Sequence, residues 1–464
     1  MEAPTLPPEL LADLPPAVVA YIRWLEARVA DLEARLNQNS TNSSQPPSAD
    51  PPGVKRAPPK PKSGKAAGGQ PGHPRHERAL VGRPDAVCDC KPAACRRCAR
   101  PLTGDDPEPR RHQVTELPPV TPVVTEYRRH RLTCPGCGAT TCADLPAGVA
   151  GQDGPRLRAA CALLTGAFRL SKAKAARLLG DLFDIPLSAG QVCATEAAVG
   201  AQLGPVTDAL LAAARGRPAN VDETGMGRGK WLWALVTAVA TVFRIAAGRS
   251  RTVFTDLVGA DHRRVVTTDR YAVYDHLPAW RHQLCWAHLR RDFQAMIDRS
   301  NGGTAAGTAL LALSDELFAL WKRVRDGTLT RARFGGKMHA GRDFRVRVRA
   351  ALARGAEGGC AKTAATCRAL LDREVSLFVF AFHAGVEPTN NAAERAVRHG
   401  VLWRKQSGGP KSAAGAAYLA HIWSVVETCR QHRRNVWAYL TACIDAADHG
   451  RPLPGLLPPE AHAA

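Results

Sequence analysis

Residues 219–248 read ANVDETGMGRGKWLWALVTAVATVFRIAAG and decide the fold class. ANVDET predicts a short buried strand, and the runs KWLWALVTAVA and VFRIAAG, which are rich in β-branched and aromatic residues, predict a hairpin. Further on, RTVFTDLVG (251–259) predicts a helix, VVTTD (265–269) a strand, and HQLCWAHLRRDFQAM (282–296) a strand that runs into a helix. Strands interleaved with helices after an antiparallel hairpin indicate an α/β fold.

Helical sequence follows this pattern. An Ala-, Leu- and Arg-rich stretch comes first, and after Glu387-Pro388 the runs TNNAAERAVRHGV and AAGAAYLAHIWSVVETCRQH predict two more helices. We therefore divide the C-terminal part of the chain into a first part of the core (218–298), a helical insertion (299–386), C-terminal helices of the core (387–446) and a tail (447–464).

Three acidic residues stand where the chain can bring them together. Asp222 is placed at the end of the first strand and Asp269 at the end of VVTTD. The carboxyl ends of strands are where sites gather in α/β sheets. Glu394 falls in the first turn of a predicted helix. Three such carboxylates supply the oxygen ligands that hard divalent cations prefer, and two cations would stabilise the entering and leaving oxygens of an in-line displacement.

Each acid also has a structural interpretation. Asp222 fits a turn, and Asp269 fits the cap of the turn before Tyr271. The run from Asn391 to Glu394 resembles a capping box, in which Glu394 would reach back to the amide of Asn391. Spacing alone leaves both interpretations open for all three residues.

Seven of the 14 cysteines fall within residues 85–147. Four of them form two C-x-x-C knuckles, Cys95-Arg-Arg-Cys98 and Cys134-Pro-Gly-Cys137, and the strand-like runs HQVTELP and VVTEYRRHRL lie between these knuckles. Knuckles at the tips of hairpins let four thiolates close a tetrahedral Zn²⁺ site, so the segment predicts a zinc-ribbon-like structure. A redox role is the alternative. The spare candidate ligands are Cys88, Cys90 and Cys142.

The N-terminal part of the chain predicts a helix and then a linker. In residues 1–38, apolar residues from Val18 to Leu36 recur at spacings of four and three, which favours a short coiled coil that pairs two chains in parallel. A helix packed on its own protein is the alternative. Residues 39–84 are rich in Pro, Gly, Ser and Asn and carry basic residues, which predicts a disordered basic linker.

Residues 150–215 predict a helical segment. Its first run ends at Asp184-Ile-Pro186, where proline blocks continuation, and Ser188 can cap the next helix. A short turn between helices that expose Arg and Lys suits a DNA-binding helix-turn-helix. An ordinary helical hairpin fits equally well.

Composition favours a nucleic-acid partner. Lys and Arg total 63 against 42 Asp and Glu, for a formal net charge of +21. Such an excess favours binding to a polyanion, DNA or RNA first. No run of 18 apolar residues is present, and the N-terminus lacks the features of a signal peptide. We therefore expect a protein that spans no membrane and stays in the cytoplasm, where thiols are reduced.

Several motifs appear in one order along nearly the whole chain. They are the NQNSTNSSQPPSAD linker, the paired knuckles, VDETG, TTDRYAVY, LCWAHLRRDF and TNNAAERAVR. Together they resemble the insertion-sequence-66 (IS66) family of bacterial transposases, and the linker and the last helix are specific to that family. The stretch GMGRGKWLW is shorter than in many relatives, which puts a substrate-contacting loop in doubt.

This resemblance implies a DDE transposase with an RNase H-like catalytic core. By position, Asp222, Asp269 and Glu394 would be the catalytic acids and would hold two Mg²⁺ or Mn²⁺ ions, while a structural Zn²⁺ would occupy the cysteine segment. The residues expected to contact DNA phosphate are His288, Arg398, Arg404 and Lys405. The implied partners are terminal inverted repeats, target DNA, further copies of the chain and accessory proteins of the same element, in association with the bacterial nucleoid.

Three functions remain to be compared. A transposase would cut DNA at the ends of an element and join the freed 3′-hydroxyls to target DNA. A nuclease or resolvase with the same core would cut without strand transfer. A non-enzymatic zinc-ribbon regulator would leave the ordered set VDET, TTDRY and NNAAER without a role.

Overall fold

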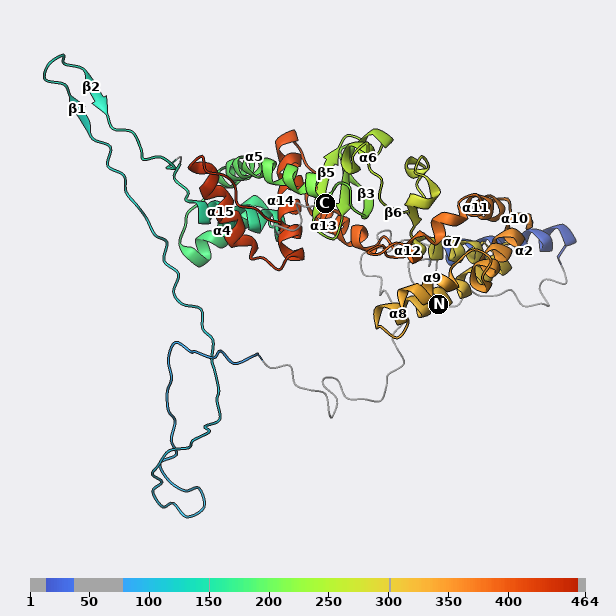
Figure 1. The fold of residues 1–464 in the computed structure, drawn as a ribbon, viewed down its shortest axis with the longest axis horizontal. Helices are drawn as coiled ribbons and strands as arrows, with labels where there is room; N and C mark the ends of the chain where they lie inside the picture. The colour runs from blue at the N-terminus through green and yellow to red at the C-terminus, as the bar shows by residue number, and fades with distance from the viewer. Residues whose placement is uncertain (1–13, 37–77, 150, 300–301, 458–464) are drawn as a thin grey trace. The chain divides into compact units, whose positions relative to one another are not determined.

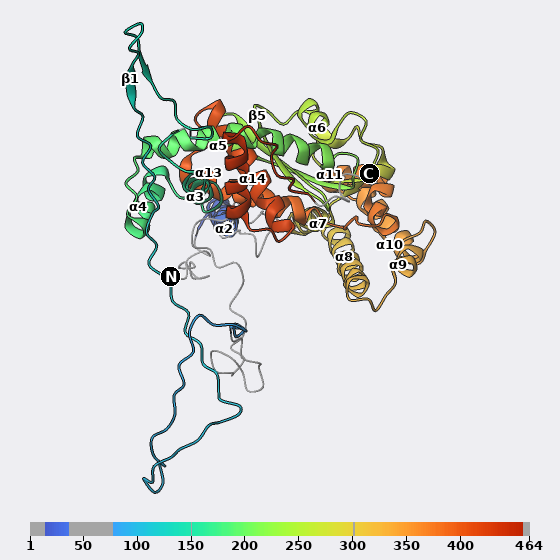
Figure 2. The same cartoon turned by 60° about the vertical axis from the view of Figure 1, so that its left-hand side comes forward.

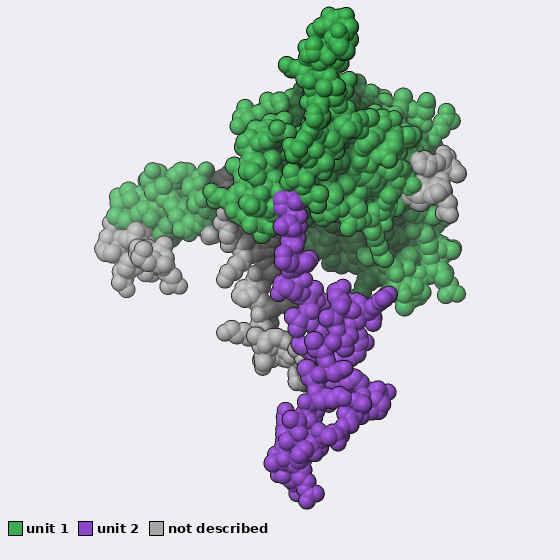
Figure 3. Space-filling view, turned by 90° about the vertical axis from the view of Figure 1, so that its left-hand side faces the viewer, with its two compact units in different colours: residues 1–56, 123–464 green, residues 57–122 purple. Residues whose placement is uncertain are grey.

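The computed structural model describes residues 14–36, 78–149, 151–299 and 302–457. The chain divides into two compact units, residues 57–122 and the remainder (Figure 3). The linker predicted for residues 39–84 lies largely outside the described residues. The larger unit, residues 1–56 and 123–464, holds the α/β part, and its main elements are visible in Figures 1 and 2.

A five-stranded mixed sheet forms the centre of this unit, in the order β5-β4-β3-β6-β7. The pairs β3·β4 and β4·β5 are antiparallel, whereas β3·β6 and β6·β7 are parallel. This confirms the predicted α/β class and the predicted hairpin. The strands are β3 (Ala219–Gly227), β4 (Lys230–Val236), β5 (Thr241–Ala246), β6 (Val266–Thr268) and β7 (His282–Leu284).

Two helices from the C-terminal part pack on this sheet. Helix α13 (Asn391–Ser407) packs against β3 and β4, and α14 (Ala413–Gln431) packs against β5 and α5 (Ala189–Ala214). A Cβ added at Gly400 would stand 2.3 Å from Leu232 Cδ2, so α13 comes this close to β4 because that residue is glycine. The TNNAAER motif therefore begins a helix that lies directly on the first strand.

Helix α14 also covers the edge strand β5. The Ser424 hydroxyl accepts a hydrogen bond from the Phe243 amide at 2.8 Å, and Thr428 Oγ1 accepts one from the Thr241 amide at 3.1 Å. Edge strands expose unpaired backbone groups, and a covering helix is one way to protect them. The edge of the sheet at β5 is closed in this way.

The helical segment before the sheet is α3 (Pro155–Ala162), a π turn, α4 (Lys172–Phe183) and α5 (Ala189–Ala214). Ser188 caps α5 through a complete capping box with Gln191, as its position predicts. By length and composition alone, α5 would pass as a membrane span. Leu203 and Leu210 of α5 are buried in the protein core, however, which is how a core helix meets the same test.

The insertion is helical and has its own core. This core includes Trp286 and Leu289 of α7 (Trp286–Asp298) and residues from the insertion. The insertion helices are α8 (Thr304–Arg325), α9 (Arg331–Lys337), α10 (Asp343–Glu357), α11 (Ala361–Asp372) and α12 (Val379–Phe382).

Part of the segment that we assigned to a tail packs against the rest of the protein. Helix α15 (Val436–Asp448) packs against α3, and the described residues after it contact the same core. The Tyr439 hydroxyl donates to the carbonyl of Pro454, and Leu456 and Leu457 are buried. Residues 458–464 lie outside the described residues.

The cysteine segment has fewer strands than predicted. The run HQVTELP forms no strand, and of VVTEYRRHRL only the end belongs to β1 (Arg131–Thr133), which pairs with β2 (Thr140–Cys142). The apolar residues of these runs, such as Val114 and Val123, are exposed. A high β propensity does not produce a strand where, in the described part of the chain, no neighbouring strand pairs with the segment. Helix α2 (Pro16–Leu36) lies where the coiled coil was predicted, and its pairing with a second chain stays a prediction.

Candidate active site

Asp222 lies inside β3, directly opposite Ala234 of β4. The strand runs on to Gly227, so Asp222 does not end it as predicted, and the alternative of a turn residue is wrong. On its other side β3 pairs with β6 in parallel, with Asn220 opposite Thr267. Asp222 and Asp269 each follow these paired residues by two positions, which sets both at one level on the same face of the sheet.

Asp269 directly follows β6 and caps the turn after it. The Tyr271 amide donates to Asp269 Oδ1 at 2.9 Å, so the structural interpretation of this residue is correct. It does not exclude a second role, because one carboxylate can accept several hydrogen bonds or bind a cation through its other oxygen.

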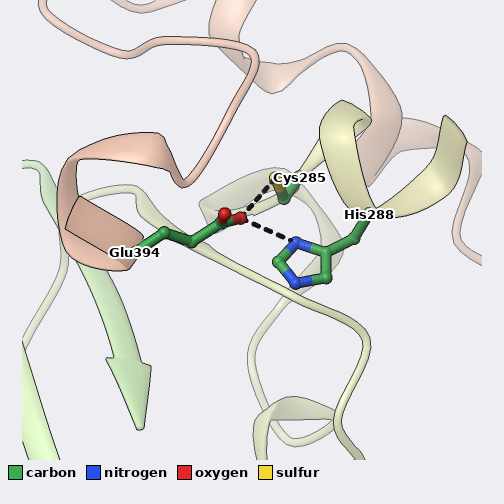
Figure 4. A group of neighbouring side chains, drawn as sticks. All are labelled: Cys285, His288 and Glu394. Atoms are coloured by element: carbon green, nitrogen blue, oxygen red, sulfur yellow. Dashed lines mark hydrogen bonds and ion pairs between the residues drawn. The ribbon is translucent and has the colours of Figure 1, made fainter. Parts of the chain in front are cut away.

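Glu394 lies in the first turn of α13, but not in a capping box. The N-cap residue is Asn390 rather than Asn391, and no side chain caps this helix end. Instead, Glu394 Oε1 lies 3.2 Å from His288 Nδ1 (Figure 4). The same oxygen lies 3.6 Å from the Arg291 guanidinium. The capping-box alternative is therefore wrong, and the carboxylate faces α7.

Asn390 fixes the start of α13 to the sheet. It is fully buried, and its Nδ2 donates to the Val221 carbonyl at 2.7 Å. Its Oδ1 accepts from Asn220 Nδ2 at 3.1 Å, and its amide donates to Cys285 Sγ at 3.0 Å. The side chain of Asn390 thus links the helix that carries Glu394 to β3, and the backbone amide of Asn390 links that helix to Cys285 at the start of α7.

The carboxylates influence one another electrostatically. Burial, the neighbouring Glu223, Asp269 and Glu394 together raise the pKa of Asp222 well above its usual range. Burial raises the pKa of Asp269, although its hydrogen bond from Tyr271 and nearby arginines oppose this. Burial also raises the pKa of Glu394, against the effect of Arg291. The three predicted acids therefore share one electrostatic environment.

A fourth carboxylate belongs to this environment and was not predicted. Burial raises the pKa of Glu223 to about 7, although the Tyr274 hydroxyl donates to its carboxylate and Arg249 lies 3.8 Å away. The Arg249 guanidinium lies over the rings of Trp231 and Tyr271, 4.5 and 4.1 Å from their centroids. The only sequence signal for Glu223 was its place beside Asp222.

The four residues predicted to contact phosphate differ in their surroundings. His288 faces Glu394, and burial and two arginines lower its pKa to about 3, so it is neutral. Arg404 donates to the Gly225 carbonyl of β3. Arg398 and Lys405 are exposed on α13, and Arg395, which the sequence did not single out, is exposed three residues before Arg398. Of the four predicted residues, Arg398 and Lys405 are therefore the exposed cations that could bind phosphate.

The donor set of the acids fits hard divalent cations. Asp222 and Asp269 offer carboxylate oxygens, and the charge of Asp222 is disfavoured by burial and by its acidic neighbours. Such a cluster of negative charge is stabilised by cations that prefer oxygen ligands. In the part of the chain that the structure describes, the tighter group of possible metal donors is a different one, Cys285, His288 and Glu394.

The two cysteine knuckles have the same backbone geometry. The first cysteine of each accepts a hydrogen bond from the amide four residues on, Ala99 or Gly138, and both of these residues have positive φ. The amides of Cys95 and Cys134 donate to carbonyls five residues on, both at 2.8–2.9 Å. Because the knuckles fall in separate units, the shared four-cysteine site stays a prediction.

Comparison with known sequences identifies the family. The model of the transposase IS66 family matches residues 151–418, more than half of the chain. The chain belongs to this family. The match covers the sheet, the insertion and α13, and so every acid of the candidate site in this transposase-family chain. Residues 2–79 match a family of unknown function (DUF6444).

A curated relative adds little on function. The chain is similar to an uncharacterized protein, y4qI, of Sinorhizobium fredii, with 25% identity over 297 residues. The match covers 55% of this chain and 52% of the relative, so this IS66-family chain spans about half the length of the curated relative it matches.

Proposed function

We propose that this chain is a DNA transposase whose RNase H-like core binds two Mg²⁺ or Mn²⁺ ions through Asp222, Asp269 and Glu394. It would cut DNA at the ends of an insertion sequence and join the 3′-hydroxyls to target DNA. The mixed sheet supports this proposal, with its antiparallel hairpin, its two parallel strands and the helix α13 lying on β3.

The observation that carries the proposal is the convergence of three distant acids. Asp222 lies in β3 and Asp269 directly follows β6, the parallel neighbour of β3, and the charges of Asp269 and Glu394 both act on Asp222. Buried like charges oppose one another and are rarely kept together without a cation or a proton. Convergence of this kind is typical of functional sites.

Bound cations would supply charge stabilisation to the entering and leaving oxygens of the phosphodiester. The residues of the chain would position the acids. Asn390 holds the helix of Glu394 against the strand of Asp222, so the acids are positioned before DNA arrives. Water would attack at each element end and the freed 3′-hydroxyl would attack target DNA, so neither step needs a Ser or Tyr nucleophile.

The exposed basic face of α13 would guide the DNA backbone. Arg395, Arg398 and Lys405 recur at spacings of three and seven residues, which places them on one side of the helix. Because Glu394 lies on the same helix, a phosphate bound by this face would lie beside the acids. The net charge of +21 supports such electrostatic binding.

The other parts of the chain would serve assembly and recognition. The knuckles of Cys95, Cys98, Cys134 and Cys137 would hold a structural Zn²⁺, and the exposed apolar residues of α2, such as Leu25 and Leu32, would pair two chains. We further propose that α4 and α5 bind DNA as a helix-turn-helix.

A strand-transfer assay tests the proposed function. The full chain, Mg²⁺, duplexes that carry the terminal inverted repeats flanking its gene and a supercoiled target plasmid are combined. Joined products are expected. Cleaved ends without joined products would favour the nuclease or resolvase, and a gene without flanking inverted repeats would oppose the transposase. Binding without any cleavage would favour a regulator.

A further inference from the structure

Three donor atoms of different chemistry meet beside the acids. Cys285 Sγ, His288 Nδ1 and a Glu394 carboxylate oxygen all lie within 4.8 Å of one another. Figure 4 shows the carboxylate pointing toward both the thiol and the imidazole. Cys285 Sγ lies 4.0 Å and His288 Nδ1 3.2 Å from Glu394 Oε1. The contact of the thiol with the carboxylate is a long hydrogen bond, and His288 Nδ1 makes no hydrogen bond to the carboxylate.

The C-x-x-H spacing explains how two donors come from one short segment. Cys285 is the N-cap of α7, and the His288 amide donates to the Cys285 carbonyl at 3.1 Å, which forms the first turn. An N-cap residue and the residue three positions later lie on the same side of a helix start. The third donor reaches them from α13.

Two observations favour a bound cation at this cluster. His288 Nδ1 is buried and has no hydrogen-bond partner of ordinary geometry, although the Glu394 oxygen is near. A buried polar atom without a partner is costly, and a cation between a nitrogen lone pair and a carboxylate would satisfy both. In addition, the Asn390 amide donates to Cys285 Sγ at 3.0 Å, the kind of outer hydrogen bond that supports a metal-bound thiolate.

We propose that Cys285, His288 and Glu394 bind one borderline-soft dication, Zn²⁺ or a close chemical relative, with one coordination position left open. Thiolate and imidazole select such ions, whereas the oxygen donors Asp222 and Asp269 favour Mg²⁺ or Mn²⁺. The binding site does not depend on the proposed function. Its consequence does, because Glu394 belongs to both sites: an ion held here would take up one oxygen of the carboxylate that we propose to bind Mg²⁺ or Mn²⁺ with Asp222 and Asp269.

Cobalt titration of the full chain tests this site without DNA. Co²⁺ replaces Zn²⁺ in such sites, and bonds from cobalt to thiolate absorb in the near ultraviolet. Millimolar Mg²⁺ is kept present so that the oxygen-rich site is occupied. The variants are Cys285→Ser and His288→Gln, and the matched control is Cys193→Ser, an exposed cysteine of α5.

Cys285→Ser and His288→Gln are each expected to bind one equivalent of Co²⁺ fewer than the unsubstituted chain, and Cys285→Ser to lose part of the thiolate absorption. The control should match the unsubstituted chain. The knuckle cysteines contribute equally to all four proteins, so the difference does not depend on them. Circular dichroism checks folding, and His288→Gln decides alone if Cys285→Ser does not fold. Equal stoichiometry in all four proteins would overturn the site, whatever strand transfer shows.

Discussion

Asn390 Nδ2 donates a hydrogen bond to the carbonyl oxygen of Val221 at 2.7 Å, and this bond fixes the first turn of α13 to β3 one residue before Asp222. Glu394 is one helical turn from Asn390. The same contact therefore helps to set the distance between the carboxylates of Asp222 and Glu394. The position of the third acid thus depends in part on the side-chain amide of Asn390, which is fully buried.

Replacing Asn390 by Ala should weaken both the fold and the chemistry. The change leaves the Val221 carbonyl without its donor, which should lower the free energy of unfolding by about 1–3 kcal/mol. Strand transfer should fall about 100-fold, because a shift of about 1 Å at a catalytic group can cost that much. Asn391→Ala, at the exposed neighbouring residue, is the control and should change neither the melting temperature nor strand transfer.

Glu223 should make stability depend on pH. Burial raises its pKa from 4.5 to about 7, so the folded state holds this proton more tightly than the unfolded chain does. Its stabilising contribution is fully present below about pH 4.5 and is lost as the pH rises through about 7. Glu223→Gln should therefore reduce the fall in unfolding free energy between these values, measured by denaturant titration of metal-free protein. An identical pH profile for both proteins would refute the assignment.

The basic face of α13 should appear in the salt dependence of DNA binding. Arg398→Ala and Lys405→Ala should each reduce the slope of log affinity against log salt by about 1, as expected for one lost phosphate contact. Lys362→Ala, an exposed lysine of the insertion, serves as the control. Slopes that do not change in either α13 variant would place the DNA elsewhere.

The knuckles should account for one bound zinc. Changing Cys134 and Cys137 together to Ser should lower the zinc content by one equivalent in native mass spectrometry, since four thiolates are needed to close the tetrahedral site. Cys142→Ser, a neighbouring cysteine outside both knuckles, should keep the full content. An unchanged zinc content in the Cys134/Cys137 variant would remove this site.

The strands could be predicted from sequence because their signals are local, whereas the three acids were singled out by the resemblance to the IS66 family and their catalytic role stays a prediction. β-branched runs marked β4 and β5, and the order VDET, TTDRY and NNAAER pointed to the three acids. The links between these elements could not be predicted. The contacts of Asn390 and the ion pair of Glu223 with Arg249 depend on which strands pair and which helix lies on them.

Two of the features that the sequence misassigned have physical causes of the same kind. HQVTELP has the composition of a strand, but its apolar side chains are exposed and, among the residues that the structure describes, no strand pairs with it. Asn391 and Glu394 have the spacing of a capping box, yet the helix begins one residue earlier and the carboxylate faces His288 and Arg291. In both places the tertiary environment outweighed a correct local pattern.

Strand transfer by Glu394→Gln protein tests the central claim most directly. Glutamine keeps the shape of the side chain but removes the charge that would hold a divalent cation. We expect the variant to bind element-end DNA normally and to lose Mg²⁺-dependent cleavage and joining, as Asp222→Asn and Asp269→Asn should. Glu357→Gln, at an exposed glutamate of the insertion, should retain full activity. Robust Mg²⁺-dependent strand transfer by the Glu394→Gln protein would contradict the account and return Glu394 to a structural role.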